Sequence, residues 1–277
     1  MQDATPRERF TALVQRGEAD IDLAEAALLI AAEAYPRLDV TRHLAALDRL
    51  ADAAEPRLSG ATSDLARARV LIHFLAAEQR FSGNQGDYHD VRNSFLNEVL
   101  ERRTGIPITL ALVYIEVGRR LGLPMVGIGF PGHFLVKLAG VEDIVIDPFF
   151  GCILDEQACA ERLRSVVGQE ATFDRRLLRA ATAKEILVRM LRNLKQIYLQ
   201  ARELKPALAC SERILLVEPE LAHELRDRGL LYHQLECYAA AQLDLQRFLS
   251  LVPGDDSADA IRDKLIEIRR HGGTTLH

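Results

Sequence analysis

Apolar residues recur at helical spacing through the first eighty residues of the chain. Segments 22–33, 39–54 and 63–79 each carry apolar side chains three or four positions apart, on a background of strong helix formers. Pro36 and Pro56 follow the first two segments, where a proline is expected to end a helix. The pattern therefore predicts a helical N-terminal part.

The pattern changes at Phe81. Residues 81–94 (FSGNQGDYHDVRNS) concentrate Gly, Asn and Asp and predict a loop, after which helical spacing resumes over 94–103 and 107–121. Three short segments rich in β-branched or aromatic residues then lie between glycines and prolines, and they predict strands. These segments are 125–130, 133–138 and 143–147. A single small sheet among helices predicts the α+β class.

The rest of the chain, from Glu156 onward, has a helical pattern and repeats with a period of 34. Pro219 and Pro253 are 34 residues apart. The same offset relates Tyr198 to Tyr232, Ala207 to Ala241 and Leu215 to Leu249. This period with a closing proline is typical of tetratricopeptide repeats, which are antiparallel helix pairs. We expect a helical linker, about two repeats and a capping helix near 257–270, and we expect so short an array to pack on the N-terminal domain.

Composition narrows the function classes. Apolar residues make up 48% and charged residues 27% of the 277 residues, which is the balance of a globular protein. No apolar run approaches the length of a membrane span, and the N-terminus lacks a signal-peptide pattern, so a cytoplasmic protein without membrane contact is expected. The four cysteines show no C-x-x-C spacing, which predicts neither a disulfide framework nor a zinc site.

Charge gives little reason to expect nucleic acid as a partner. The formal net charge is -5, so electrostatics do not favour binding to phosphate in general. Residues 161–205 are locally basic, with eleven Lys and Arg against five Asp and Glu. A solvated helical face explains this stretch best, and a site for an acidic partner or nucleic acid is the weaker alternative.

Candidate chemistry lies in the predicted hairpin. If the chain turns around Gly140, antiparallel pairing places residues opposite one another when their numbers add to 280, which pairs His133 with Asp147. An aspartate beside a histidine is the base-and-orienter part of a nucleophilic triad. A catalytic thiol would lie at the start of a packed helix. The predicted helix there begins with Pro107, which suits the first helical turn but cannot attack a substrate.

Five ordered motifs give the chain a family resemblance. They are NSFLN at 93–97, RTGIPI at 103–108, RLGLP at 120–124, PGHFL at 131–135 and IDPFF at 146–150. With the N-terminal helices and the C-terminal repeats, these motifs resemble the SirB-type, transglutaminase-like proteins over nearly the whole chain. The resemblance implies a papain-like α+β core, with domain 1–160 containing a helical part at 1–80 and a core at 81–152, followed by a repeat segment at 161–277.

The resemblance also assigns the site. Active transglutaminase-like enzymes carry G-x-C at the helix start, and the match of Gly105, Ala111 and Gly122 to the flanking positions puts Pro107 at the nucleophile position. His133 and Asp147 correspond to the family's histidine and aspartate. This departure implies a non-catalytic form, in which the pair either satisfies itself inside the protein or lines a retained binding groove. The groove residues would be Asn93, Asn97 and Thr109.

Two residues are candidates for a substitute nucleophile. Thr109 lies two residues after Pro107, although a hydroxyl at this position is expected to bond to the backbone. Cys152 lies five residues after Asp147, although free cysteines are usually packing residues. Asp87 and Asp90 flank Tyr88-His89 in the predicted loop, where turn formation and helix capping explain them better than metal binding. We expect no metal and no cofactor.

The sequence thus leaves two principal hypotheses. The first is a non-catalytic transglutaminase-like protein that acts as an adaptor or regulator, with its repeats binding another protein or a peptide. The second is a thiol-type acyltransferase or peptidase, in which Cys152 or Thr109 works with His133 and Asp147.

Overall fold

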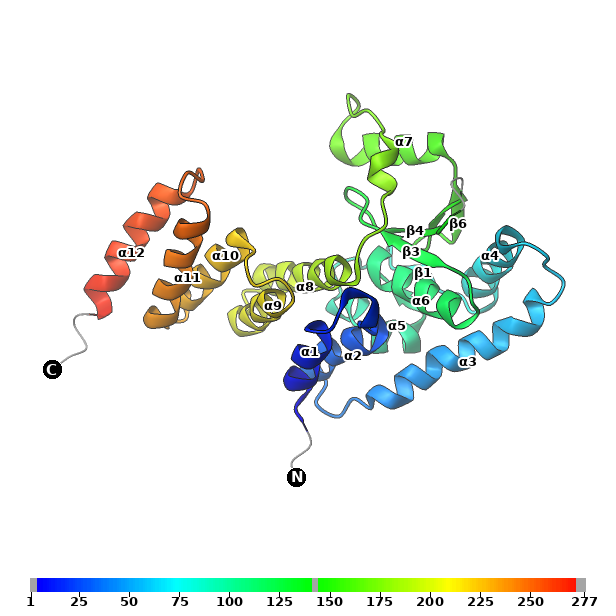
Figure 1. Cartoon of the computed structure of the whole chain (residues 1–277), viewed down its shortest axis with the longest axis horizontal. Coiled ribbons are helices and arrows are strands. Elements are labelled where there is room, and N and C mark those ends of the chain that lie inside the picture. The colour runs from blue at the N-terminus through cyan, green and yellow to red at the C-terminus, as the bar shows by residue number, and fades with distance from the viewer. Residues whose placement is uncertain (1–3, 141–143, 273–277) are drawn as a thin grey trace. The chain divides into compact units, whose positions relative to one another are not determined.

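The computed structural model describes residues 4–140 and 144–272 and divides the chain into two compact units. These are Met1–Leu187 and Val188–His277 (Figure 1). The expected domain end at residue 160 falls within a helix of the first unit. No helix in the described part is long and apolar enough to cross a membrane.

The first unit opens with helices, as the apolar spacing predicted. They are α1 (Pro6–Val14), α2 (Leu23–Ala34), α3 (Val40–Leu58) and α4 (Asp64–His73), with a 3-10 turn at Glu18–Asp20 and a π-helical turn at Phe74–Glu78 after α4. A short polar side chain caps each N-terminus by accepting a backbone N–H bond. These caps are Thr5, Asp22, Asp39 and Ser63.

Helix α3 does not end before Pro56, contrary to the sequence-based expectation. It continues through this proline to Leu58. Pro56 removes only the backbone hydrogen bond to the carbonyl of residue 52, and it lies in the last turn, where few further bonds depend on that one. Leu58 itself is buried. Its burial favours continuation of the helix for two residues after the proline.

The core of the unit is a four-stranded antiparallel sheet between helices. The strands, in spatial order, are β3 (Met125–Ile128), β4 (Leu135–Leu138), β5 (Val145–Asp147) and β6 (Cys152–Leu154). Strand β6 was not predicted. The helices of this part are α5 (Leu96–Arg102), α6 (Pro107–Arg120) and α7 (Glu156–Val167), and 3-10 turns lie at Val91–Ser94 and Arg175–Leu178. The predicted loop also contributes β1 (Ser82–Gly83), which pairs in parallel with β2 (Thr104–Gly105).

The hairpin register differs from the predicted one by two residues. Val136 lies opposite Ile146 and Lys137 opposite Val145, so opposed residue numbers add to 282 rather than to 280. The tip of the predicted turn and the first residue of the predicted third strand, residues 141–143, lie outside the described residues. Because side chains alternate with a period of two, a shift of two residues keeps every side chain on its predicted face.

The sheet buries both faces against helices. Residues 107–118 of α6 are all buried. Met125 of β3 packs on Gly118 of α6, where a Cβ atom would lie only 2.7 Å from the methionine sulfur. Ile128 has the opposite parity in the same strand and packs with Cys159 and Leu163 of α7. Since neighbouring parities face opposite sides of a strand, α6 and α7 cover opposite faces of the sheet, as Figure 1 shows.

The second unit has the predicted 34-residue repeat. Helix α8 (Ala183–Gln200) begins at the end of the first unit. It is followed by α9 (Leu204–Val217), α10 (Ala222–Gln234), α11 (Tyr238–Leu251) and α12 (Ala258–Gly272). Arg202 and Glu236, which are 34 residues apart, both have φ of 60° in the turns after α8 and α10. The repeat therefore extends to an unusual backbone conformation that the sequence does not mark with glycine.

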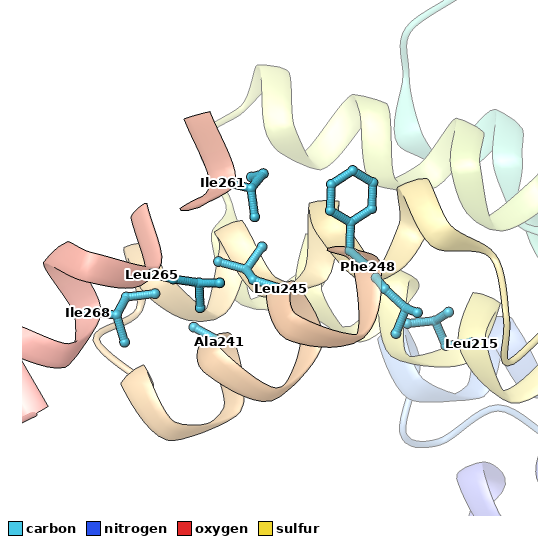
Figure 2. Packing of buried hydrophobic residues seen from close by; sticks show 8 residues of the cluster. Leu215, Ala241, Leu245, Phe248, Ile261, Leu265 and Ile268 are labelled. Carbon is cyan, nitrogen blue, oxygen red and sulfur yellow. The ribbon is translucent and has the colours of Figure 1, made fainter. Parts of the chain in front are cut away.

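Apolar side chains of the last helices form the core of the second unit (Figure 2). The buried cluster joins α9 to α12 through Leu215, Leu225, Ala241, Leu245, Phe248, Ile261, Leu265 and Ile268. Leu245 lies against Gly229 of α10, where a Cβ atom would approach the leucine side chain to 2.8 Å. Helix α12 thus covers the end of the repeat array, as expected of a capping helix.

Candidate functional site

A tight turn after β3 positions His133. Gly132 has φ of 63°, and a Cβ atom there would lie 2.3 Å from Cγ1 of Val166, so both the backbone and the packing require glycine. The backbone N–H of His133 donates to the carbonyl of Phe130 at 3.1 Å. The residue is 9% exposed. Its imidazole is therefore largely buried and fixed in orientation.

Asp147 ends β5 and is fully buried. Its Oδ1 accepts a hydrogen bond from Nε2 of His133 at 2.9 Å and another from the backbone N–H of Phe149 at 3.0 Å. A carboxylate that accepts from Nε2 leaves Nδ1 as the basic nitrogen of the neutral ring. The predicted His133–Asp147 contact thus exists, although His133 precedes β4 and the two residues are not opposed in the sheet.

Arg162 of α7 is part of the same cluster, and sequence analysis missed it. Its guanidinium lies 3.0 Å from Oδ2 of Asp147 and 4.9 Å from the ring centroid of Phe150. Phe150 in turn stacks on His133 with an interplanar angle of 23° and remains half exposed. The helical spacing offered one signal. Arg162 lies three residues after Cys159, so both residues are on the same face of α7, and Cys159 packs on the sheet.

Buried polar atoms without hydrogen bonds gather around Asp147. In the described part of the chain they include Tyr114 Oη and Arg162 Nε, while Asp147 Oδ2 has only its 3.0 Å ion pair with Arg162. Burial, helped by the negative charge of Asp147, raises the pKa of the Tyr114 hydroxyl, which stays a protonated donor. Unsatisfied polar atoms cost free energy and are uncommon in protein interiors. Their concentration makes this cluster the candidate functional site.

Pro107 is the first residue of α6 and is buried. Thr109, the first candidate substitute, is also buried and uses its hydroxyl within the protein. The hydroxyl donates to the carbonyl of Asn93 at 2.7 Å and accepts from the backbone N–H of Ile106 at 3.2 Å. These bonds satisfy the start of α6 in the manner of a helix cap. The geometry supports the backbone-bonded role of Thr109.

Cys152, the second candidate substitute, lies opposite Asp147 in the β5–β6 pairing. Burial raises the pKa of its thiol, and the negative charge of Asp147 raises the pKa further, whereas Arg162 opposes the shift. A nucleophilic cysteine needs the reverse, because only the thiolate attacks. The position of Cys152 is close to the cluster, but its electrostatic surroundings keep it protonated.

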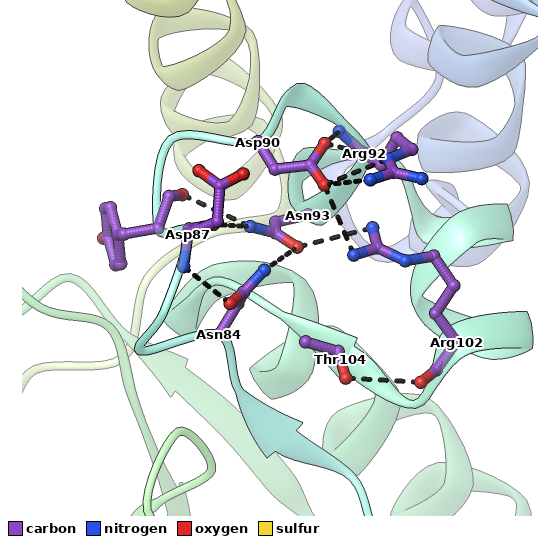
Figure 3. A network of polar contacts seen from close by, with 8 residues as sticks. Asn84, Asp87, Asp90, Arg92, Asn93, Arg102 and Thr104 are labelled. Carbon is purple, nitrogen blue, oxygen red and sulfur yellow. Dashed lines mark hydrogen bonds and ion pairs between the residues drawn. The ribbon is translucent and has the colours of Figure 1, made fainter.

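Asn93 takes part in a polar network of the 81–94 loop (Figure 3). Its Nδ2 donates to the carbonyl of Asp87 at 2.8 Å, and its Oδ1 accepts from Nδ2 of Asn84 at 3.2 Å. Asp90 accepts from Arg92 at 2.7 Å, and this bond lowers the pKa of the Asp90 carboxyl. The predicted turn and capping roles of this loop are thus seen directly in its hydrogen bonds.

The loop shows no candidate metal centre. Within the part of the chain that the structure describes, no three His, Cys, Asp or Glu side chains are grouped so that they could hold a metal ion. Asn97, the remaining predicted groove residue, lies on α5 and lines a separate cavity, whose lining includes neither His133 nor Asp147. Within the predicted set, His133 bonds to Asp147 and Thr109 bonds to the carbonyl of Asn93, while Asn97 lines the separate cavity.

Comparisons with known proteins agree with this fold. Residues 41–192 match the family model described as Transglutaminase-like superfamily, and residues 194–265 match the Tetratricopeptide repeat model. The chain is 40% identical over 258 residues to a UPF0162 protein of Xylella fastidiosa, and the match covers 90% of each chain.

Two further relatives are similar over most of their length. One is a UPF0162 protein of Vibrio cholerae, 31% identical over 93% of this chain and 96% of the relative. The other is Protein SirB1 of Salmonella typhimurium, 30% identical over 83% of this chain and 86% of the relative. This chain belongs to the transglutaminase-like superfamily, within the group that includes the UPF0162 and SirB1 proteins and carries C-terminal tetratricopeptide repeats.

Proposed function

We propose that this protein is a non-catalytic member of its superfamily that acts as an adaptor or regulator by binding another protein or peptide. One observation carries the proposal: Pro107 occupies the start of α6, where the resemblance places the nucleophile, while His133 and Asp147 remain paired at 2.9 Å. A base without a nucleophile cannot form the covalent acyl intermediate that this chemistry requires.

The two possible substitutes do not favour the enzymatic alternative. The Thr109 hydroxyl is engaged by Asn93 and Ile106, and the raised pKa of Cys152 reduces its thiolate at neutral pH. The tetratricopeptide match supports the binding role, because stacked helix pairs present an extended surface to a peptide or a partner helix.

Amine incorporation and peptide hydrolysis test the catalytic half of the proposal. Wild type, His133→Ala and a control, His73→Ala, are compared at equal concentration, since His73 is an exposed histidine of α4. We expect all three proteins to be equally inactive. Turnover by wild type and His73→Ala that disappears in His133→Ala would refute the proposal and show that another residue supplies the nucleophile.

A capture assay tests the proposed binding of a partner. A partner captured on the immobilised full chain is expected to be released when residues 188–277 are deleted, and to be retained by His133→Ala. A partner held equally well by the fragment that lacks the second unit would assign binding to the transglutaminase-like unit instead.

A further inference from the structure

Arg162 and His133 contact the same two groups. Nε2 of His133 lies 2.9 Å from Oδ1 of Asp147, and the Arg162 guanidinium lies 3.0 Å from Oδ2 of the same carboxylate. The Phe150 ring stacks on the His133 ring, with 6.4 Å between the ring centroids, and the Arg162 guanidinium carbon lies 4.9 Å from the Phe150 centroid. A carboxylate and an aromatic face both stabilise a positive charge. Arg162 therefore shares with His133 both groups that could stabilise an imidazolium.

This sharing changes what Asp147 can do for the histidine. In a nucleophilic triad, the aspartate stabilises the imidazolium that forms when the histidine takes the proton of the nucleophile. Asp147 is fully buried, and Arg162, whose guanidinium stays protonated in proteins, already supplies its carboxylate with a positive charge. A second positive charge, on His133, has no further negative charge to offset it.

The formal charges of this cluster cancel when His133 is neutral, because Asp147 and Arg162 carry opposite charges. Three further titratable side chains are close enough to Asp147 for its charge to act on them: Tyr114 of α6, Cys152 of β6 and Cys159 of α7. Burial raises the pKa of each, so all three stay neutral at pH 7. A protonated histidine would thus leave a net positive charge in a largely buried place, which desolvation disfavours.

We propose that Arg162 is a positioning residue that holds His133 in its neutral form. This role rests on the proposed non-catalytic function and adds an obstacle to acyl transfer that is independent of Pro107. In acyl transfer, a proton passes from the thiol or hydroxyl of the nucleophile to the free ring nitrogen of the histidine. The resulting imidazolium would share the charge of Asp147 with Arg162, so the ion pair that activates a nucleophile is disfavoured.

Nuclear magnetic resonance of the full chain with ¹³C-labelled histidine measures how much of His133 is protonated on both nitrogens, and the spectrum of His133→Ala assigns its signal. Arg162→Gln and Arg162→Met both remove the positive charge. The glutamine keeps a hydrogen-bond donor for Asp147, and the methionine keeps an apolar stem against Phe150. We expect the ratio of imidazolium to imidazole at His133, compared at one pH, to be at least about tenfold higher in both variants than in wild type.

Two further variants separate charge from structure. Arg162→Lys keeps the positive charge and is expected to give a ratio within about twofold of wild type. Arg164→Gln removes the same charge from a position two residues further along α7, and it serves as the matched control.

The role of Arg162 is overturned if a charge-removing variant with an unchanged circular dichroism spectrum has the ratio of wild type. It is also overturned if Arg162→Lys raises the ratio as much as Arg162→Gln does, because the charge would then not be the cause. Turnover by wild type would refute the proposed function and leave these ratios measurable. An unchanged ratio would overturn the role of Arg162 alone, because Pro107 still lacks a nucleophilic atom.

Discussion

At the scale of single residues, the unusual chemistry of this protein lies in polar atoms that lack partners. Tyr114 and Arg162 contribute such atoms around the His133–Asp147 pair, and Asn97 of α5 contributes another. Neither group could be located from the sequence, because satisfaction of a polar atom depends on contacts between residues far apart in the chain. Their environments, more than their residue types, distinguish these side chains.

Cys152 provides a residue-scale prediction with a definite sign. Because burial and Asp147 raise its pKa above the ordinary value of 9.0, its thiol is largely neutral at pH 7.5, and its alkylation rate keeps rising through pH 9. Cys237 is exposed and is expected to react first with iodoacetamide at pH 7.5. Mass spectrometry of tryptic peptides after timed quenching measures both rates.

The two buried cysteines serve as slow-reacting references in this experiment. Cys159 and Cys210 are buried, and burial raises the pKa of Cys159 to about 11, so both are expected to react slowest. Labelling of Cys152 ahead of Cys237 at pH 7.5 would contradict the prediction and favour the thiol-enzyme hypothesis.

At the scale of elements, periodicity predicted most of the fold, and local exceptions account for what it missed. Helices α2, α3 and α6 and strands β3 to β5 follow apolar spacing. Strand β6 was missed because only Ile153 of its three residues is β-branched, whereas the equally short β5 lies in the β-branched run at 144–146. The hairpin register failed by two residues because the sequence alone does not specify how many residues the turn takes up. The shift nevertheless keeps each strand residue on its predicted face, and for this reason the predicted contact between His133 and Asp147 is found.

The site was predicted less completely than the fold. The resemblance placed Pro107, His133 and Asp147, but Arg162 lay in a basic stretch that suggested a solvated surface. Its ion pair with Asp147 depends on how α7 crosses the sheet, which no local pattern encodes. Asn97 was predicted as a groove residue, and it lines a cavity whose lining includes neither His133 nor Asp147.

A buried ion pair links the elements of the second unit. Nζ of Lys195 in α8 lies 2.6 Å from Oε1 of Glu224 in α10, and the hydroxyl of Ser211 in α9 donates to the same oxygen at 2.6 Å. Lys195 is 7% and Glu224 is 2% exposed. Replacing Lys195 with Met leaves the buried Glu224 without its nearest cation, with Arg192 3.9 Å away, which we expect to lower the free energy of unfolding by about 3 kcal/mol.

A double-mutant cycle separates the pair from simple loss of packing. Lys195→Met combined with Glu224→Gln removes both charges, and we expect it to cost clearly less than the sum of the single changes, with a coupling of about 1–3 kcal/mol. Urea denaturation followed by circular dichroism gives each value. Strict additivity would show that the two side chains do not interact in solution.

At the scale of the whole molecule, helix α8 belongs to both units. Contacts assign Ala183–Leu187 to the first unit, where Ile186 approaches Gly127 of the sheet, and assign the rest of the helix to the second. Two helix pairs and a capping helix are fewer than the roughly three repeats that usually fold alone. The integrity of the second unit therefore depends on α8 remaining attached to α9 and α10.

Truncation tests which surface the repeats protect. A chain cut before Lys205 keeps all of α8 but loses the helices that follow it. Met190, Leu191 and Leu194 of α8 are at most 1% exposed in the full chain, and we expect the cut to remove part of their cover. We expect this 1–204 fragment to aggregate. A 1–187 fragment, which ends at the contact boundary, is expected to remain monomeric in size-exclusion chromatography with light scattering. If 1–187 aggregates as readily as 1–204, the apolar surface belongs to the first unit itself, and the repeats protect the transglutaminase-like unit as well as their own first helix.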